Sequence, residues 1–364
     1  MKKVKKKKLL FTAYNFGIGG IESALINLLN RIDYSKYDVD VVLEQKKGDL
    51  LDDVNPNVKV KEFRVCSNKN IILRKLINGC RRLGFLLLNY HKYDFSCCYA
   101  TYSKSGAKIS LIASRNSSFY VHSDYKYVYK KKGDFLRFFD EREINKFRRI
   151  IFVSNESCNS FCKLYPQLRE KLMVFNNFID VDKIEKLSLE KVEEKRNKKK
   201  ILFTFVGRLD DSSKKLGRAF EIVNNIKNLE LFVIGDGPDR EKYEALVRKL
   251  KLTDRVFFLG AKKNPYPYIR MCDYLILTSD YEGFPVTYLE AIALKKPIIT
   301  TIDVSCDGIN IGKDCGYIIS KDEVKMIEEV RKILSSPRSS TDIDLNSIQD
   351  DRIKELEKLF DEVI

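Results

Sequence analysis

The chain has 364 residues, of which 44% are hydrophobic and 11% aromatic, so it can bury the cores of two domains and is not a largely disordered protein. Nine cysteines without a Cys-x-x-Cys pair, and only two histidines, argue against a disulfide scaffold, a structural zinc site and an iron–sulfur cluster. The net charge of +16 comes entirely from the first half of the chain. Residues 1–180 hold 34 basic and 18 acidic side chains, whereas residues 181–364 hold 33 of each.

The first half alternates short apolar runs with amphipathic stretches, which predicts the strands and helices of an α/β domain. It begins with a buried strand over 8–14, a glycine turn at Gly17–Gly20 and a helix over 21–32. The other predicted strands cover 38–43, 58–63, 95–100, 118–122, 150–153 and 172–175, and the other predicted helices cover 71–89, 105–113, 135–147 and 156–164.

The apolar period is lost within 177–200, which ends in a run of charges, and we place a domain junction and linker there. The alternation then restarts, with predicted strands at 201–207, 229–235, 256–260, 274–279 and 297–301, predicted helices at 216–226, 240–250 and 286–294, and a charged helical tail at 343–364. Such alternation predicts a parallel sheet in each half, with a cleft where the carboxyl ends of the strands converge. The expected domains are 1–178 and 179–344.

Two glycine clusters follow predicted strands. Gly17–Gly20 could let backbone N–H groups approach an anion at a helix N-terminus, although a tight turn without a ligand is the alternative. Glu22 stands where a dinucleotide-binding fingerprint has glycine, which weakens the interpretation as a dehydrogenase. The second cluster, Gly235–Pro238, is a weak signal when taken alone.

Two cations follow the strand that ends at Gly207. Arg208 lies at its carboxyl end and Lys214 just before the next helix. The planar guanidinium of Arg208 and the compact ammonium of Lys214, at the same edge of the sheet, suit the binding of a diphosphate. A solvated basic loop is the alternative, because Lys215 and Arg218 are also near.

The segment Ser279–Ala291 carries the most specific pattern. Glu282 lies in the loop after a strand, and Glu290 lies one turn inside the next helix, within reach of hydroxyls such as those of a ribose. Backbone N–H groups of residues 283–287 fall at the start of this helix, where a phosphate is favoured.

In this order, GIGGIE, VGRLDDSSKK, IGDGPDREK, FFLGAKKNPYPYI and SDYEGFPVTYLEAIALKKPIITT resemble glycosyltransferase family 4. The resemblance is strong over 201–319, moderate over 8–30 and 118–180, and weak over 31–117. It implies the GT-B fold, in which two Rossmann-like α/β domains with parallel sheets face each other across a cleft. It also implies retaining transfer from a nucleotide-sugar, a donor-binding C-terminal domain, an acceptor-binding N-terminal domain, and a tail helix over about 345–364 that packs back on the N-terminal domain.

The resemblance also implies roles for residues of the second half. Arg208 and Lys214 would neutralise the donor diphosphate, with Lys215 left open because the spacing is one residue longer than usual. Glu282 would contact the donor sugar and Glu290 the ribose. The remaining donor-binding positions supply backbone near the donor or frame its base, and they are Gly207, Gly235, Leu259, Gly283, Phe284, Pro285 and Val286.

In the first half, Gly19 and Gly20 would approach the donor phosphate, and His122 would face the reacting sugar. The expected catalytic set is therefore His122, Arg208, Lys214 and Glu282. A hydrogen-bonded histidine at a strand end is the alternative for His122. The pairs Asp38–Asp40 and Asp180–Asp182 are interpreted as structural, and neither a metal nor another cofactor is expected because cations and a helix dipole can stabilise the leaving group.

The stretch Tyr120–Phe139 alternates tyrosines, lysines and phenylalanines, and the predicted helix 71–89 adds four cations. This pattern is typical of single-stranded nucleic-acid binding or of a membrane interface, and a solvated loop is the alternative. Because similar proteins often act on lipid-linked acceptors, we expect a cytoplasmic protein that sits peripherally on the inner face of the cell membrane. The expected partners are a nucleotide-sugar donor, a glycan or lipid-linked acceptor and an anionic membrane surface, without nucleic acid.

The resulting expectation is a retaining glycosyltransferase that moves a sugar from a UDP-sugar to a growing surface glycan, such as a capsule or lipopolysaccharide. Within enzymes, the alternatives are an inverting GT-B transferase with His122 as its base and a nucleotide-sugar epimerase. A basic nucleic-acid-binding protein is the alternative of another class, but it leaves Glu282 and Glu290 unexplained. The last alternative is a non-catalytic partner subunit, and the presence of Arg208, Lys214, Glu282 and Glu290 argues against it.

Overall fold

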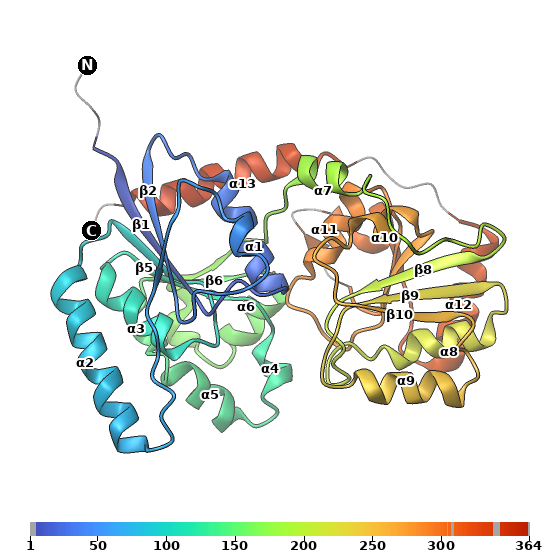
Figure 1. Cartoon of the computed structure of the whole chain (residues 1–364), viewed down its shortest axis with the longest axis horizontal. Helices are drawn as coiled ribbons and strands as arrows, with labels where there is room; N and C mark the ends of the chain where they lie inside the picture. Colours follow the sequence, from blue (N-terminus) through green and yellow to red (C-terminus); the bar gives the residue numbers. More distant parts are fainter. Residues whose placement is uncertain (1–4, 304, 307–308, 338–342, 363–364) are drawn as a thin grey trace. The chain divides into compact units, whose positions relative to one another are not determined.

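The computed structural model describes residues 5–303, 305–306, 309–337 and 343–362 (Figure 1). The chain divides into two compact units, each built on a parallel sheet. The N-terminal unit comprises Met1–Phe178 and Gln349–Ile364, and the C-terminal unit comprises Ile179–Ile348.

The N-terminal unit has a sheet of seven parallel strands with its first strand near the centre. In spatial order these are β3(Lys59–Glu62), β2(Tyr37–Leu43), β1(Lys7–Ala13), β4(Phe95–Cys98), β5(Ser117–Val121), β6(Arg149–Phe152) and β7(Leu172–Val174). The strand order reverses between β1 and β4, and ligands of open α/β sheets bind outside the carboxyl ends of the strands at such a point.

Helices and short turns connect these strands: α1(Gly20–Arg31), α2(Ile71–Asn89), α3(Lys104–Ala113), α4(Tyr125–Val128), α5(Lys132–Asp140) and α6(Asn155–Cys162). The last helix, α13(Leu345–Asp361), brings the end of the chain onto this unit. The Phe360 ring packs against the rings of Phe11 and Phe95, and the Arg352 guanidinium donates to the Asn177 carbonyl at 2.7 Å.

The structure corrects two predictions in the N-terminal unit. The predicted helix 135–147 ends at Asp140, and a 3-10 turn over Ile144–Lys146 follows Glu143, whose φ of 57° breaks the helix. The interpretation of Tyr120–Phe139 as an exposed aromatic surface is wrong for most of its rings. Those of Tyr120, Phe135, Phe138 and Phe139 are buried in the unit's core. The period of these aromatic residues therefore reflects packing, and Tyr127 is an exposed exception.

The C-terminal unit has a sheet of six parallel strands. In spatial order these are β10(Val256–Gly260), β9(Leu229–Ile234), β8(Ile201–Val206), β11(Tyr274–Leu277), β12(Ile298–Thr300) and β15(Gly316–Ile318). Its helices are α7(Val181–Leu187), α8(Gly217–Asn225), α9(Arg240–Lys249), α10(Tyr266–Met271), α11(Val286–Ala293) and α12(Glu323–Ser335). A short antiparallel pair, β13(Ser305–Cys306) and β14(Ile309–Asn310), and a π-helix over Ile311–Cys315 precede β15. Strand order reverses between β8 and β11.

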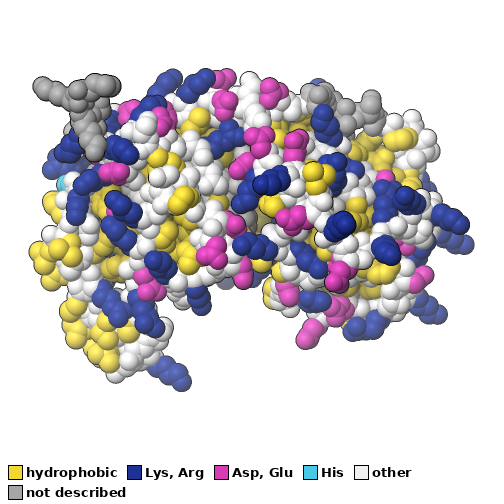
Figure 2. All heavy atoms as spheres, turned by 45° about the horizontal axis from the view of Figure 1, so that its top comes forward, with side chains coloured by type: hydrophobic (Ala, Val, Ile, Leu, Met, Phe, Trp, Pro, Cys, Tyr) yellow, Lys and Arg dark blue, Asp and Glu magenta, His cyan; other side chains and the backbone are white. Residues whose placement is uncertain are grey.

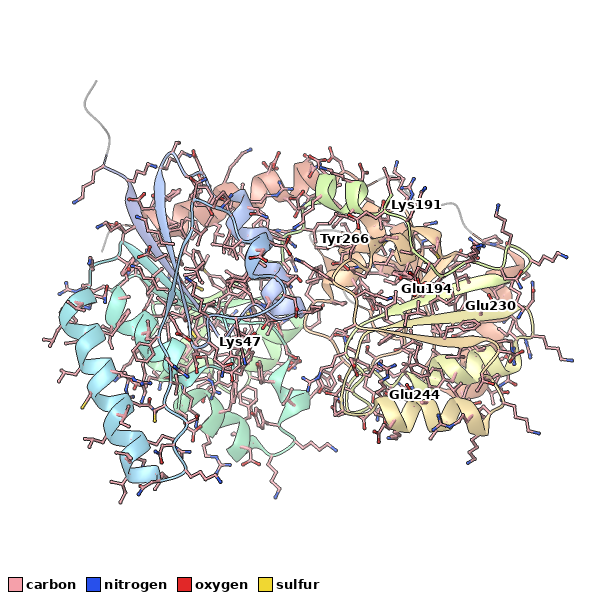
Figure 3. The ribbon with its side chains drawn as sticks, viewed as in Figure 1. Lys47, Lys191, Glu194, Glu230, Glu244 and Tyr266 are labelled. Carbon is pink, nitrogen blue, oxygen red and sulfur yellow. The ribbon has the colours of Figure 1, made fainter. Side chains whose placement is uncertain are left out.

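Of the segment predicted as a linker, 177–200, all but its first two residues belong to the C-terminal unit and are fastened to it. Asp180 caps α7 by accepting the Lys183 N–H at 3.0 Å. Beyond the helix, Glu194 (Figure 3) accepts the Tyr268 hydroxyl at 2.7 Å, and Arg196 pairs with Asp273 at 2.5 Å. The charge run thus contributes fixed ion pairs instead of a flexible spacer.

Candidate functional site

The predicted residues of the C-terminal unit gather where its strand order reverses. Arg208 and Lys214 follow β8, and Glu282 follows β11, the neighbouring strand in the sheet. Both loops leave the carboxyl edge of a parallel sheet at its switch point, which is where this class of sheet binds ligands.

Lys214 and Glu282 contact each other directly. The Lys214 Nζ lies 2.6 Å from Glu282 Oε1, and the Ser279 hydroxyl donates to the same oxygen at 2.6 Å. Both charged side chains are largely buried, with exposed fractions of 17% and 11%. The pair places a partly desolvated ammonium beside a carboxylate, which suits recognition of an anionic group with neighbouring hydroxyls.

Hydrogen bonds hold the loops of Lys214 and Glu282 together. The Asp280 N–H donates to the Ser213 carbonyl at 2.7 Å, and the Thr278 hydroxyl donates to the Lys215 carbonyl at 3.0 Å. Arg218 adds an ion pair to Asp280 at 2.7 Å. These contacts fix the backbone on both sides of the Lys214–Glu282 pair.

Lys215 lies in a different environment from Lys214. Its φ of 49° turns the chain, and its Nζ lies 3.9 Å from a carboxylate oxygen of Asp211. Lys214 is therefore the lysine of this loop that the structure brings to Glu282. Arg208 is exposed, and among the described residues its guanidinium has no hydrogen-bond or ion-pair partner.

Gly207 and Gly235 meet at the ends of β8 and β9. A Cβ on Gly235 would lie 1.9 Å from the Gly207 carbonyl oxygen, and its φ of +138° also favours glycine. The Gly235 N–H donates to the Gly260 carbonyl at 2.9 Å, which links this turn to the end of β10 beside Leu259. Leu259 itself is partly buried against the cluster of Phe232 and Ile234.

The loop after β11 leads into α11 through a buried run of backbone. Gly283, Phe284, Pro285 and Val286 are all buried. Pro285 is the N-cap residue, and no side chain caps the N–H groups of the first turn. The first turn contains no acidic residue either, so an anion is favoured at this helix end.

Glu290 lies inside α11 and is buried, with 7% of the residue exposed. Burial raises the pKa of its carboxyl to about 7, and a hydrogen bond from Tyr266, at the start of α10, opposes this shift (Figure 3). A buried carboxyl with a pKa near neutral lowers the free energy of unfolding, so such a group is typical of a functional site rather than of a purely structural one.

In the N-terminal unit, the predicted glycines precede α1. Gly19 is its N-cap residue and Gly20 its first residue, and a Cβ on Gly20 would meet nothing within 4 Å. Gly48, with a φ of +128°, lies so close to the Phe16–Gly17 backbone that a Cβ would clash with it. The glycine turn is therefore braced by the loop after β2.

His122 follows β5 and is enclosed by aromatic rings. Its ring stacks on Tyr120 at 4.6 Å and lies 4.5 Å from the Tyr99 ring. Burial lowers the pKa of His122 to about 3, which the Tyr99 backbone opposes. Neither ring nitrogen makes a hydrogen bond of normal geometry with a described residue. His122 is thus neutral at physiological pH, with unused hydrogen-bonding capacity.

Two carboxylates near the switch point of the N-terminal sheet were not predicted as site residues. Glu22, in the first turn of α1, accepts the Tyr102 hydroxyl at 3.2 Å, and Glu44, after β2, accepts the Ser103 hydroxyl. Burial raises the pKa of both carboxyls. Glu22 comes just after the predicted glycine turn and Glu44 just after the predicted strand 38–43, and these positions are the sequence signal that could have identified them as site residues.

No group of three or more His, Cys, Asp or Glu side chains within the described residues is arranged to hold a metal ion. A cavity of 440 Å³ in the C-terminal unit is lined by residues that include Lys200, Asn228 and Tyr274. These residues flank the amino ends of strands, so this cavity lies away from the edge that carries Lys214 and Glu282.

Two family models together match most of the chain. "Glycosyltransferase Family 4" matches residues 18–183, and "Glycosyl transferases group 1" matches residues 188–350. A glycosyltransferase of Methanocaldococcus jannaschii described as uncharacterized is 29% identical over 47% of this chain and 46% of its own length.

A second relative matches nearly end to end. It is the N-acetylgalactosamine-N,N'-diacetylbacillosaminyl-diphospho-undecaprenol 4-alpha-N-acetylgalactosaminyltransferase of Campylobacter jejuni, 25% identical over 98% of this chain and 96% of its own. The fold matches that of Anabaena HepE in complex with UDP-glucose, with a TM-score of 0.74 and 17% identity over 97% of this chain and all of that one. The chain is therefore a nucleotide-sugar glycosyltransferase of the GT-B fold and belongs to glycosyltransferase family 4, a family of retaining enzymes.

Proposed function

We propose that this enzyme transfers a sugar from a UDP-sugar, with retention of anomeric configuration, to a lipid-linked glycan that becomes part of a cell-surface polysaccharide. The observation that carries the proposal is the contact between Lys214 and Glu282, which lies at the switch point of the C-terminal sheet. The match to a protein crystallised with UDP-glucose supports uridine as the base.

In this proposal the C-terminal unit binds the donor. Arg208 and Lys214 neutralise the diphosphate, and the uncapped start of α11 adds the backbone N–H groups of Gly283, Phe284 and Val286. Glu282 accepts hydrogen bonds from hydroxyl groups of the sugar, and Glu290 accepts hydrogen bonds from the hydroxyl groups of the ribose. As the bond from the sugar to the diphosphate breaks, negative charge grows on the departing phosphate, and the fixed cations stabilise it.

His122 then contributes as a neutral hydrogen-bonding group and not as a proton acceptor. A group with a pKa of about 3 is a weak base at neutral pH, which disfavours an inverting mechanism with His122 as general base. Its two unpartnered ring nitrogens can instead accept from and donate to hydroxyls of the reacting sugar.

A lipid-linked acceptor is supported by the C. jejuni relative, whose name specifies a diphospho-undecaprenol substrate. Within the part of the chain that the structure describes, no helix combines the length and apolar character needed to cross a bilayer. We place the enzyme on the cytoplasmic face of the membrane, held there by contacts of the basic N-terminal unit with anionic lipid.

The proposal is tested by transfer assays with a panel of UDP-, GDP- and ADP-sugars and a polyprenyl-diphosphate glycan as acceptor. We expect turnover with a UDP-sugar and an α-linked product from an α-linked donor, as read by the anomeric proton signal. A β-linked product would reject retention. Turnover with a GDP- or ADP-sugar alone would reject uridine while keeping the enzyme class.

A further inference from the structure

Ser279 places a buried hydroxyl group beside the Lys214–Glu282 pair. It follows the last residue of β11 by two positions, and it is fully buried. Its hydroxyl donates to Glu282 Oε1 at 2.6 Å, which is the only hydrogen bond of this hydroxyl to a described residue. Because the Lys214 Nζ lies 2.6 Å from the same oxygen, Glu282 Oε1 has two donors.

The other carboxylate oxygen of Glu282 is left open. Among the described residues, none donates a hydrogen bond to Glu282 Oε2. The Glu282 side chain is largely but not completely buried. Oε2 is therefore the carboxylate oxygen that can accept a hydrogen bond from a ligand while Oε1 stays bound to the protein.

Both neighbouring strands fix the backbone on which the Ser279 hydroxyl stands. Thr301, which follows β12, donates its hydroxyl to the Ser279 carbonyl at 2.6 Å. The next residue, Asp280, donates its N–H to the Ser213 carbonyl in the loop after β8. The strands β8, β11 and β12 are neighbours in the sheet, so the hydroxyl is held from both sides before any ligand binds.

The two donors to Glu282 Oε1 differ in charge, and a bound diphosphate affects them differently. Figure 2 shows many Lys and Arg side chains at the surface, whereas Lys214 is largely buried against a carboxylate. A diphosphate that engages Lys214 draws the ammonium away from Glu282, because one cation is then shared between two anions. The neutral Ser279 hydroxyl has no such competitor and remains bound to Oε1.

We infer that Ser279 is the positioning residue of Glu282. When the donor diphosphate engages Lys214, the Ser279 hydroxyl holds Oε1 in place, and Oε2 accepts a hydrogen bond from a hydroxyl of the donor sugar. The inference deepens the proposed donor site and rests on it. Since Ser279 acts through Glu282 and does not itself contact the nucleotide, its removal should affect sugar transfer and spare nucleotide binding.

The test is the variant Ser279→Ala, measured in the full chain with the nucleotide-sugar that the natural chain turns over. We expect kcat for transfer to fall at least about 10-fold and the Kd for UDP to stay within about threefold, because only the carboxylate loses a hydrogen bond. The matched control is Ser188→Ala, which removes another buried hydroxyl of the C-terminal unit. That hydroxyl donates to the Glu185 carbonyl within α7, so this control should keep both values.

A double-mutant cycle separates positioning of Glu282 from a general effect on the fold. In a Glu282→Ala background no carboxylate remains to be positioned, so Ser279→Ala should change kcat less than about twofold further. A purely structural role of Ser279 would instead lower kcat by the same factor in both backgrounds.

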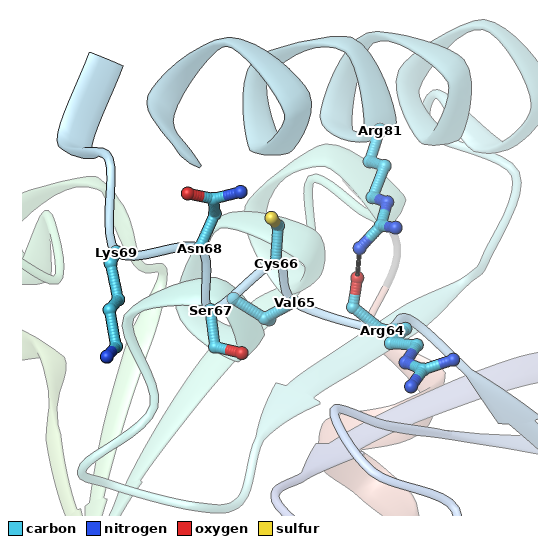
Figure 4. A pocket seen from close by; sticks show the side chains of 7 residues that line it. All are labelled: Arg64, Val65, Cys66, Ser67, Asn68, Lys69 and Arg81. Atoms are coloured by element: carbon cyan, nitrogen blue, oxygen red, sulfur yellow. Dashed lines mark hydrogen bonds between the residues drawn. The ribbon is translucent and has the colours of Figure 1, made fainter. Parts of the chain in front are cut away.

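A second cluster of cations needs its own control in the UDP titration. A cavity of 570 Å³ in the N-terminal unit is lined by seven residues that include Arg64, Lys69 and Arg81 but no carboxylate, and Figure 4 shows Arg81 donating to the Arg64 carbonyl. Lys69→Gln removes one of these cations and should leave the Kd for UDP unchanged. A loss of UDP binding in Lys69→Gln would place the nucleotide in this cavity and reject the donor site of the proposed function.

The inference itself would be overturned by a normal kcat in Ser279→Ala, by an equal loss in Ser188→Ala, or by equal factors in the two backgrounds of the cycle. A loss of UDP affinity as large as the loss of kcat would also overturn it, because Ser279 would then act on the whole site. Turnover of a GDP- or ADP-sugar by the natural chain would reject only the uridine of the proposed function. The same variants would then be compared with that donor and its nucleotide.

Discussion

The ammonium of Lys214 lies 2.6 Å from a carboxylate oxygen of Glu282, although the two residues are 68 positions apart in the chain. The two charges satisfy each other in the structure. A bound diphosphate would compete with Glu282 for Lys214 and release the carboxylate toward sugar hydroxyls. This exchange makes separate predictions for the two residues.

Replacing Lys214 should weaken nucleotide binding. Lys214→Ala should raise the Kd for UDP about 10- to 100-fold, because a charge-assisted contact contributes about 1.5–3 kcal/mol. Calorimetric titration measures the change. Lys215→Ala is the matched control, since the Lys215 Nζ lies toward Asp211, and it should stay within about threefold of the natural chain. The opposite ranking of the two variants would move the role to Lys215.

Replacing Glu282 should separate binding from turnover. Glu282→Gln removes the charge that competes for Lys214 but keeps the shape, so UDP affinity should be unchanged or higher while kcat for transfer falls at least about 10-fold. Steady-state kinetics together with a UDP titration give both values. A variant with normal kcat would show that Glu282 does not act on the donor sugar.

Glu290 should make donor affinity depend on pH. Its folded-state pKa of about 7 lies above the ordinary value of 4.5, so the carboxyl is mainly protonated at pH 6 and mainly ionised at pH 8. Ribose hydroxyls donate best to the ionised form, so affinity for a UDP-sugar should rise up to about 10-fold between pH 6 and pH 8. Glu290→Gln should flatten this dependence, and an equally steep slope in that variant would assign it elsewhere.

The same shift predicts an effect on stability. Between pH 4.5 and 7 the folded state binds more protons at Glu290 than the unfolded state does, so this group's contribution to the free energy of unfolding falls as pH rises through that window. Glu290→Gln should therefore gain stability relative to the natural chain at pH 8 and gain less at pH 5. Urea unfolding at the two pH values measures the difference, and an equal effect at both would contradict the raised pKa.

His122 should remain uncharged in mildly acidic solution. With a pKa of about 3, its ring proton signal should stay at the neutral position from pH 8 to pH 5. The chain has only two histidines, so a His122→Asn variant assigns the signal by its loss. A midpoint near 6.5 would show that the ring is hydrated and could serve as a base.

Glycine at position 235 should be required for the stability of the turn that follows β9. Gly235→Ala places a Cβ 1.9 Å from the Gly207 carbonyl and forces a φ of +138° on alanine, so it should cost at least about 1–3 kcal/mol of unfolding free energy. Gly20→Ala, whose Cβ would meet nothing within 4 Å, is the control and should keep stability. Comparable Tm values for the two variants would contradict this geometry.

Sequence periodicity was sufficient for the elements with strong apolar patterns. The predicted helix 71–89 has the bounds of α2, and the predicted strands 201–207 and 229–235 overrun β8 and β9 by one residue each. The helix α12 was missed although Asp322 caps it and Met326 and Val330 mark its buried face. The helix α7 was missed because it spans seven residues among charges and buries only Ile184.

The site was predictable as a set of residues but not as a set of contacts. Loop motifs indicated Lys214 and Glu282 as site residues. The contact between them depends on the backbone hydrogen bond from the Asp280 N–H to the Ser213 carbonyl and on the turn at Lys215. The neutral state of His122 depends on its burial, and part of its surroundings is the Tyr99 ring, which follows another strand and carries no local sequence signal.

The central claim is that the C-terminal unit holds a uridine-diphosphate site, and a thermal-shift titration of the full chain with UDP tests it most directly. At about 100 times its Kd, UDP should add roughly 2.7 kcal/mol and raise the Tm by about 5–10 °C, with a smaller shift in Lys214→Ala. GDP, ADP and CMP should give little shift. No shift with UDP at millimolar concentration, or equal shifts in the natural chain and Lys214→Ala, would contradict the account.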